Sequence, residues 1–139
     1  QKVGLEQLVE SSGHQESITF HGYLSGAALA EAMASADVGL VPMYPESQVA
    51  VPYKACDYLA AGLPLINSLP GELETKLKEY NCGRSYQAGN PESLAKALRP
   101  WLEDPNALAE AKQGAARLFE EQFDAEKIYR EYAEWLVDA

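Results

Sequence analysis

The chain has 139 residues, of which 47% are apolar and 23% charged, so it is long and apolar enough for one globular domain and does not have the composition of a disordered chain. Its net charge of −10 and its 11 scattered Lys and Arg residues argue against nucleic acid as a partner, because phosphate binding needs clustered cations. Much of the acidity follows Glu92, where we expect it on solvated helical faces.

Two cysteines, Cys56 and Cys82, lack the spacing of a zinc site. We expect reduced thiols in a cytosolic protein, and a single disulfide is the alternative. No apolar run reaches the ~20 residues that a membrane span needs, and no N-terminal signal peptide is evident. The chain begins at Gln1, without methionine and inside a helical pattern, so we expect it to be a piece of a longer protein.

Helical and strand patterns alternate along the first two thirds of the chain, and helical patterns alone follow. In chain order, they predict a helix over 2–12, a strand over 18–24, a helix over 27–36, a strand over 38–42, a helix over 52–61, a strand over 63–67, a helix over 73–80, a weak strand over 82–86, and helices over 90–102, 106–121 and 125–137. Pro52 suits the first helical position, and Gly62 suits a helix C-cap. Short apolar strands between helices indicate an α/β domain with a parallel sheet, here a single domain over 1–139 with about four strands and a helical tail.

The segment from Pro52 to Pro64, PYKACDYLAAGLP, follows a loop that leaves the carboxyl end of a predicted strand, where α/β sheets bind ligands. A helix beginning at Pro52 offers free N–H groups and the positive end of the helix dipole to an anion such as a diphosphate. Lys54 in the first turn is electrostatically unfavourable there unless it shares an anion. Asp57 lies on the same face and is suited to accept hydrogen bonds from sugar hydroxyls. The alternative is an ordinary ion pair between Lys54 and Asp57, and the spacing fits both interpretations.

Several segments resemble, in order and spacing, the donor-binding C-terminal lobe of the GT-B glycosyltransferases, most closely family 4 (glycosyl transferases group 1). They are ITFHGYL (18–24) for V-x-F-x-G-x-V, ADVGLVP (36–42) for A-D-V-x-L-x-P, the segment 52–64 for P-x-K-x-x-E-Y-x-A-x-G-x-P, NSLPGE (67–72) for the turn after the next strand, and CGR (82–84) with GNPESLA (89–95) for G-x-G-x-x…x-x-D-P-E-x-L-A. The resemblance implies a Rossmann-like parallel sheet flanked by helices. It also implies that the N-terminal acceptor lobe is absent from this chain.

The same resemblance implies roles for individual residues. The implied donor-binding set is Gly22, Tyr23, Glu46, Ala50, Val51, Lys54 and Asp57. Within it, Gly22 and Tyr23 lie beside the nucleotide base. Two main-chain N–H groups before the helix, together with Lys54, serve the diphosphate. Asp57 holds the ribose hydroxyls in place of the family's usual glutamate, while Glu46 is the nearest acid to the first glutamate of the family pair, at a different spacing.

In function, the resemblance implies a hexosyltransferase that moves a sugar from a UDP- or GDP-linked donor to an acceptor, with retention of configuration. Surface polysaccharide, glycolipid or glycoprotein biosynthesis is the expected setting. We expect no cofactor and no bound metal. The catalytic residues are unknown and belong to the absent lobe, so the fragment alone is expected to be inactive.

The expected partners are the nucleotide sugar and the N-terminal lobe of the same protein. The expected location is cytoplasmic, at most peripheral to the inner face of the membrane, with any membrane contact made through the absent lobe. Two alternatives stay open, namely a GT-B protein of the nucleotide-sugar epimerase type and a non-catalytic Rossmann-like module.

Overall fold

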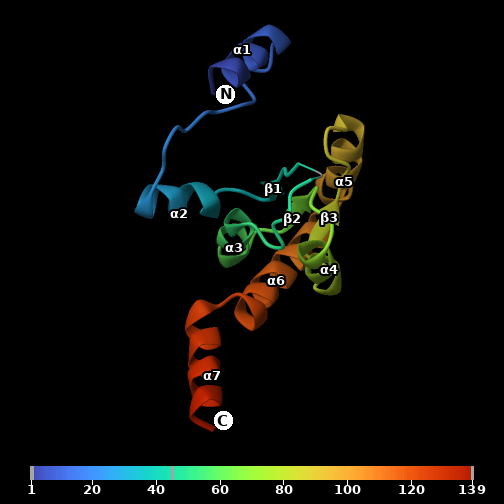
Figure 1. The fold of residues 1–139 in the computed structure, drawn as a ribbon. Helices are drawn as coiled ribbons and strands as arrows, with labels where there is room; N and C mark the ends of the chain where they lie inside the picture. Colours follow the sequence, from blue (N-terminus) through green and yellow to red (C-terminus); the bar gives the residue numbers. More distant parts are fainter. Residues whose placement is uncertain (1, 45, 139) are drawn as a thin grey trace. The chain divides into compact units, whose positions relative to one another are not determined.

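The computed structural model describes residues 2–44 and 46–138, and residues 1, 45 and 139 lie outside it. The chain divides into two compact units, Gln1–Ala30 and Glu31–Ala139. The first unit contains helix α1 (Lys2–Ser12) and the start of helix α2 (Gly26–Ala34), as Figure 1 shows in blue. The single domain predicted over 1–139 stays a prediction.

The strand predicted over 18–24 does not form. None of residues 18–24 adopts a strand conformation in the described structure. Ile18 and Phe20 show the alternation of a half-buried strand, yet their side chains are 44% and 39% exposed. Alternation alone does not make a strand, because the N–H and C=O groups of a strand need a neighbouring strand to bond. The prediction of a strand was therefore wrong for this segment.

The second unit alternates strands and helices and ends in helices. It contains β1 (Gly39–Val41), α3 (Tyr53–Ala60), β2 (Leu65–Asn67), α4 (Glu72–Glu79), β3 (Gly83–Ser85), α5 (Pro91–Glu103), α6 (Pro105–Gln122) and α7 (Ala125–Asp138). The three strands form one parallel sheet in the order β1-β2-β3 (Figure 1). The predicted class is confirmed as an α/β fold with a parallel sheet flanked by helices and a helical C-terminal end. The described residues hold three strands where about four were expected.

Local chemistry accounts for the ends of the helices around the sheet. After α3, Gly62 adopts φ 71°, and the N–H groups of Gly62 and Leu63 donate to the carbonyls of Leu59 and Tyr58. These two hydrogen bonds form a Schellman cap, which supplies donors to carbonyls in the last turn that lack a partner within the helix. Asn90 caps α5 by accepting the N–H of Ser93, and proline follows it at the first helical position.

The core lies on both faces of the sheet. Leu65 of β2 belongs to a buried cluster with α3, α4 and α6, whereas its neighbour Ile66 belongs to a second cluster with α5 and α6. Successive residues of a strand point to opposite faces, so β2, buried at all three positions, contributes to both clusters. Helix α6 contributes to both as well, and this fixes α3 and α5 against the central strand.

Candidate functional site

The start of α3 is an open helix N-terminus. Pro52 is the N-cap residue, with extended backbone (φ −73°, ψ 142°) and no side-chain hydrogen bond to the first turn. The N–H of Ala55 donates to the carbonyl of Pro52 at 2.8 Å, whereas no described group accepts from the N–H groups of Tyr53 and Lys54. Those two donors and the helix dipole are therefore available to an anion.

Two charged side chains stand on this helix. Lys54 and Asp57 are both exposed, and within the part of the chain that the structure describes no ion pair joins them. The geometry therefore does not show the ordinary salt bridge between Lys54 and Asp57 that was the alternative interpretation. Burial, followed by the neighbouring carboxylate of Asp57, raises the pKa of the Cys56 thiol.

The position of α3 depends on a close contact with β1. A Cβ on Gly39 would lie 2.6 Å from the Tyr58 ring and 2.7 Å from the Leu65 side chain, which is closer than real Cβ atoms come. Only glycine lets the Tyr58 ring rest directly on the strand. The helix therefore lies against the strand whose carboxyl end leads into the loop over 42–51.

The other predicted residues of the second unit lie in that loop. Glu46 and Ala50 are exposed, and Val51 is half-buried against the α3 side of the core. The loop thus brings Ala50, Val51 and Lys54 together at the helix start because they are adjacent in the chain. No described contact links Glu46 to Asp57.

Gly22 and Tyr23 belong to the first unit. Gly22 has φ 71°, a left-handed conformation that favours glycine, and Tyr23 is 93% exposed. Their proposed place beside a nucleotide base stays a prediction.

Sequence reasoning missed two residues at the end of β2. The Ser68 hydroxyl accepts the N–H of Met43 at 2.8 Å and donates to the Met43 carbonyl at 3.0 Å, so it fastens the loop after β1 to the end of β2. The fully buried Asn67 side chain bonds both the N–H (3.0 Å) and the carbonyl (2.6 Å) of Leu69. The available signal was a pair of small polar residues directly after a buried strand.

A cavity of about 330 Å³ opens at the carboxyl ends of β2 and β3. Its lining residues are Asn67, Ser68, Leu69, Pro70, Glu74, Ser85, Tyr86, Gln87 and Ala88. Ser85 donates its hydroxyl proton to the Glu74 carboxylate across this cavity at 2.7 Å. Ser68 therefore lies between this cavity and the loop that leads into α3.

The described residues contain no group of three or more His, Cys, Asp or Glu side chains placed to hold a metal ion. The expectation of a metal-free site stays a prediction. Across residues 2–44 and 46–138, no helix combines the length and the apolar character that crossing a membrane requires.

Comparison with known proteins adds to this geometry. Residues 2–104 match the family described as Glycosyl transferases group 1. Two D-inositol 3-phosphate glycosyltransferases, from Streptomyces coelicolor and Streptomyces avermitilis, are 27% and 29% identical over 114 residues, which cover 82% of this chain and 24% of each relative. The chain thus spans about a quarter of the length of these relatives.

Among solved structures, sucrose-phosphate synthase from Thermosynechococcus elongatus superposes with a TM-score of 0.77 at 23% identity, over 97% of this chain and 34% of that one. This likeness shows a shared fold, and together with the family match and the two relatives it supports a GT-B C-terminal lobe as the class of protein. Since the family match covers more than half of the sequence, the chain belongs to the glycosyl transferases group 1 family.

Proposed function

We propose that this chain is the donor-binding lobe of a glycosyltransferase that moves a hexosyl group from a nucleotide-diphosphate sugar to an acceptor. The observation that carries the proposal is the open start of α3, where free N–H groups lie beside Lys54, one turn before Asp57. Lys54 has no ion-pair partner among the described residues. In a chain with a net charge of −10, a cation at a helix N-terminus is suited to an anionic ligand at that point.

The chemistry assigned to this site is positioning and charge stabilisation. The diphosphate leaves with a growing negative charge as the bond to the sugar breaks. The N–H groups at the helix start and the Lys54 ammonium are donors that oppose this charge. The Asp57 carboxylate accepts hydrogen bonds from the ribose hydroxyls, and this orients the nucleotide. In this arrangement the Asp57 carboxylate faces the ribose and not the phosphates. We assign Gly22 and Tyr23 to the base, and Ala50 and Val51 to the diphosphate.

The rest of the reaction is assigned to the N-terminal lobe of the same protein. That lobe supplies the acceptor site and the catalytic residues, so the 139 residues alone are expected to bind donor weakly and to turn over none. The proposal also includes a UDP- or GDP-linked donor and transfer with retention of configuration. It includes a cytoplasmic location and a role in polysaccharide, glycolipid or glycoprotein biosynthesis. The family membership supports transfer of a sugar in general.

The test is calorimetric titration of the full-length protein with UDP-sugars and GDP-sugars. Asp57→Ala should weaken binding of the preferred donor by about 10- to 100-fold, since a hydrogen bond to a charged group contributes about 1.5–3 kcal/mol. Glu120→Ala is the matched control, because Glu120 is exposed on α6 and has no partner among the described residues. Absence of donor binding by the correctly folded full-length protein would overturn the proposal and favour a non-catalytic module.

The second candidate is an epimerase-type GT-B protein, which uses the same donor and releases its nucleotide in a different reaction. Release of UDP or GDP that depends on an added acceptor supports transfer. Release of nucleotide that leaves an epimerised free sugar supports the second candidate.

A further inference from the structure

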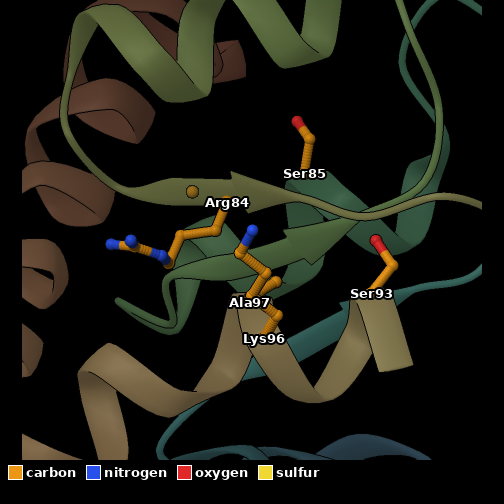
Figure 2. A pocket seen from close by; sticks show the side chains of 6 residues that line it. Arg84, Ser85, Ser93, Lys96 and Ala97 are labelled. Atoms are coloured by element: carbon orange, nitrogen blue, oxygen red, sulfur yellow. The ribbon is translucent and has the colours of Figure 1, made fainter. Parts of the chain in front are cut away.

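A second cavity lies along β3 and shares only Ser85 with the lining of the cavity at the strand ends. It has a volume of about 470 Å³ and is lined by Gly83, Arg84, Ser85, Ser93, Lys96 and Ala97 (Figure 2). The lining carries two cations and two hydroxyls and no carboxylate. Such a lining is unusual in a chain with 21 acidic and 11 basic residues, and it indicates a preference for negative charge.

The register of the sheet explains why the two cations face the same layer. Arg84 pairs with Ile66, and the Ile66 side chain packs against Trp101 of α5. Residues at matching positions of neighbouring strands point to the same face, so Arg84 faces α5 as well. Its guanidinium carbon lies 5.9 Å from the centre of the Trp101 ring, a cation–π contact that holds the side chain. Figure 2 shows Lys96 reaching from α5 toward β3, so one cation comes from each element.

Among the residues that the structure describes, Arg84 and Lys96 have no carboxylate within ion-pair distance. Lys112, by contrast, lies 2.7 Å from the Asp37 carboxylate. Two cations that line the same cavity repel each other, and an anion between them relieves that repulsion.

The hydroxyls and the strand edge add hydrogen-bond donors. The Ser93 hydroxyl accepts the N–H of Gln87 at 3.0 Å, and its own proton is not assigned to any described acceptor. Ser93 also lies in the first turn of α5, near the positive end of that helix. The Ser85 hydroxyl is already donated to Glu74 on the other face of the sheet, so Ser85 contributes only its main chain here.

β3 is an edge strand of the described sheet. The N–H of Tyr86 donates to Asn67 and that of Leu65 donates to Cys82, which sets the direction of the parallel ladder. By the alternation of that ladder, the N–H groups of Gly83 and Ser85 point away from β2, and both residues line the cavity.

We propose that this cavity is an anion site that takes a phosphate group, held by Lys96, Arg84, the Ser93 hydroxyl and the N–H groups of the β3 edge. The ligand class is a small phosphate-bearing molecule. The side-chain groups that the argument uses are donors, and the charged oxygens of a phosphate accept hydrogen bonds from them. The site is distinct from the α3 start, because its lining includes no residue of the loop over 42–51 or of α3.

The test is a titration of the ¹⁵N-labelled full chain with inorganic phosphate, followed by backbone amide shifts. We expect saturable shifts at residues 83–85 and 93–97. Arg84→Gln and Lys96→Gln should each weaken this binding by about three- to tenfold, as expected for charge-assisted contacts that are partly open to solvent. The double variant should abolish saturation. Lys78→Gln is the matched control, since Lys78 is exposed on α4, lies outside the cavity lining, and should leave binding unchanged within about twofold.

Two further readouts separate the possible outcomes. Acetate, with one charge, should bind more weakly than phosphate, and added salt should weaken both. The amides of residues 50–57 report the proposed donor site in the same spectra, so either site can fail while the other succeeds. The proposal would be overturned by equal phosphate shifts in wild type and the double variant. It would also be overturned by a well-dispersed spectrum with no saturable shift at residues 83–97. In either case the two cations are surface charges that keep the edge strand β3 from pairing with another strand.

Discussion

Replacing Gly114 by alanine sets two opposing effects against each other in α6. Alanine stabilises a helix interior by about 1 kcal/mol relative to glycine, so an isolated helix would gain from the change. In the folded chain, however, a Cβ on Gly114 would overlap the main-chain carbonyl oxygen of Tyr80 and would lie 3.2 Å from the Cys82 Cβ. A carbonyl in the main chain cannot swing aside as a flexible side chain can, so relief requires α6 to move away.

Such a movement affects the centre of the core, because Ala111, Ala115 and Leu118 of the same helix are buried. Overpacking of this kind costs about 1–3 kcal/mol, and we take the upper end because the obstacle is backbone. After subtracting the gain in helix propensity, we expect a net loss of about 2 kcal/mol in the free energy of unfolding. With a slope of about 2 kcal/mol per molar urea, the midpoint of unfolding falls by about 1 M.

The assay is urea unfolding followed by far-UV circular dichroism, with Gly4→Ala as the control. Gly4 lies in α1 and a Cβ there meets nothing within 4 Å, so the same substitution should not lower the midpoint at all. A Gly114→Ala protein as stable as wild type would refute the claim that the Tyr80 carbonyl limits the approach of α6.

Two more predictions concern buried polar groups near the sheet. Asn67→Ala leaves the buried N–H and carbonyl of Leu69 without their partner and should lower the free energy of unfolding by about 2–3 kcal/mol, measured in the same urea assay; a loss below 0.5 kcal/mol, on the order of one weak hydrogen bond, contradicts it. Burial raises the pKa of Cys82 from 9.0 to about 12, so the unfolded chain loses this proton first. The contribution of Cys82 to stability therefore falls as pH rises from 9 to 12, by about 1.4 kcal/mol per pH unit. Cys82→Ala should remove this part of the alkaline decline, and identical pH slopes for the two proteins speak against it.

Much of the fold could be predicted because its signals are local. Pro52 and Gly62 mark the ends of α3 through their own backbone preferences, and Asn90 marks the start of α5 through a side chain that bonds a nearby N–H. The strand predicted over 18–24 failed because a strand depends on a partner that a local pattern does not contain. The other strands were predicted one or two residues too long at their ends, since pairing stops before the apolar pattern does.

The candidate site divides in the same way. Ala50, Val51, Lys54 and Asp57 could be grouped from the sequence because one loop and one helix turn carry them. The role of Ser68 could not, because its hydroxyl bonds Met43, which lies 25 residues earlier in the chain. Likewise, the cavity along β3 depends on a register between strands that no single segment of sequence encodes.

The two tryptophans give the chain two optical reporters in contrasting surroundings. Trp101 is 5% exposed and lies under the Arg84 guanidinium, whereas Trp135 is 63% exposed and stacks on Tyr132 in α7. The emission of Trp101 should therefore lie to the blue of that of Trp135, and selective replacement of Trp135 by phenylalanine isolates it. A ligand that draws the guanidinium away from the ring would then change the brightness of Trp101, so that events beside β3 become visible by fluorescence without any added dye.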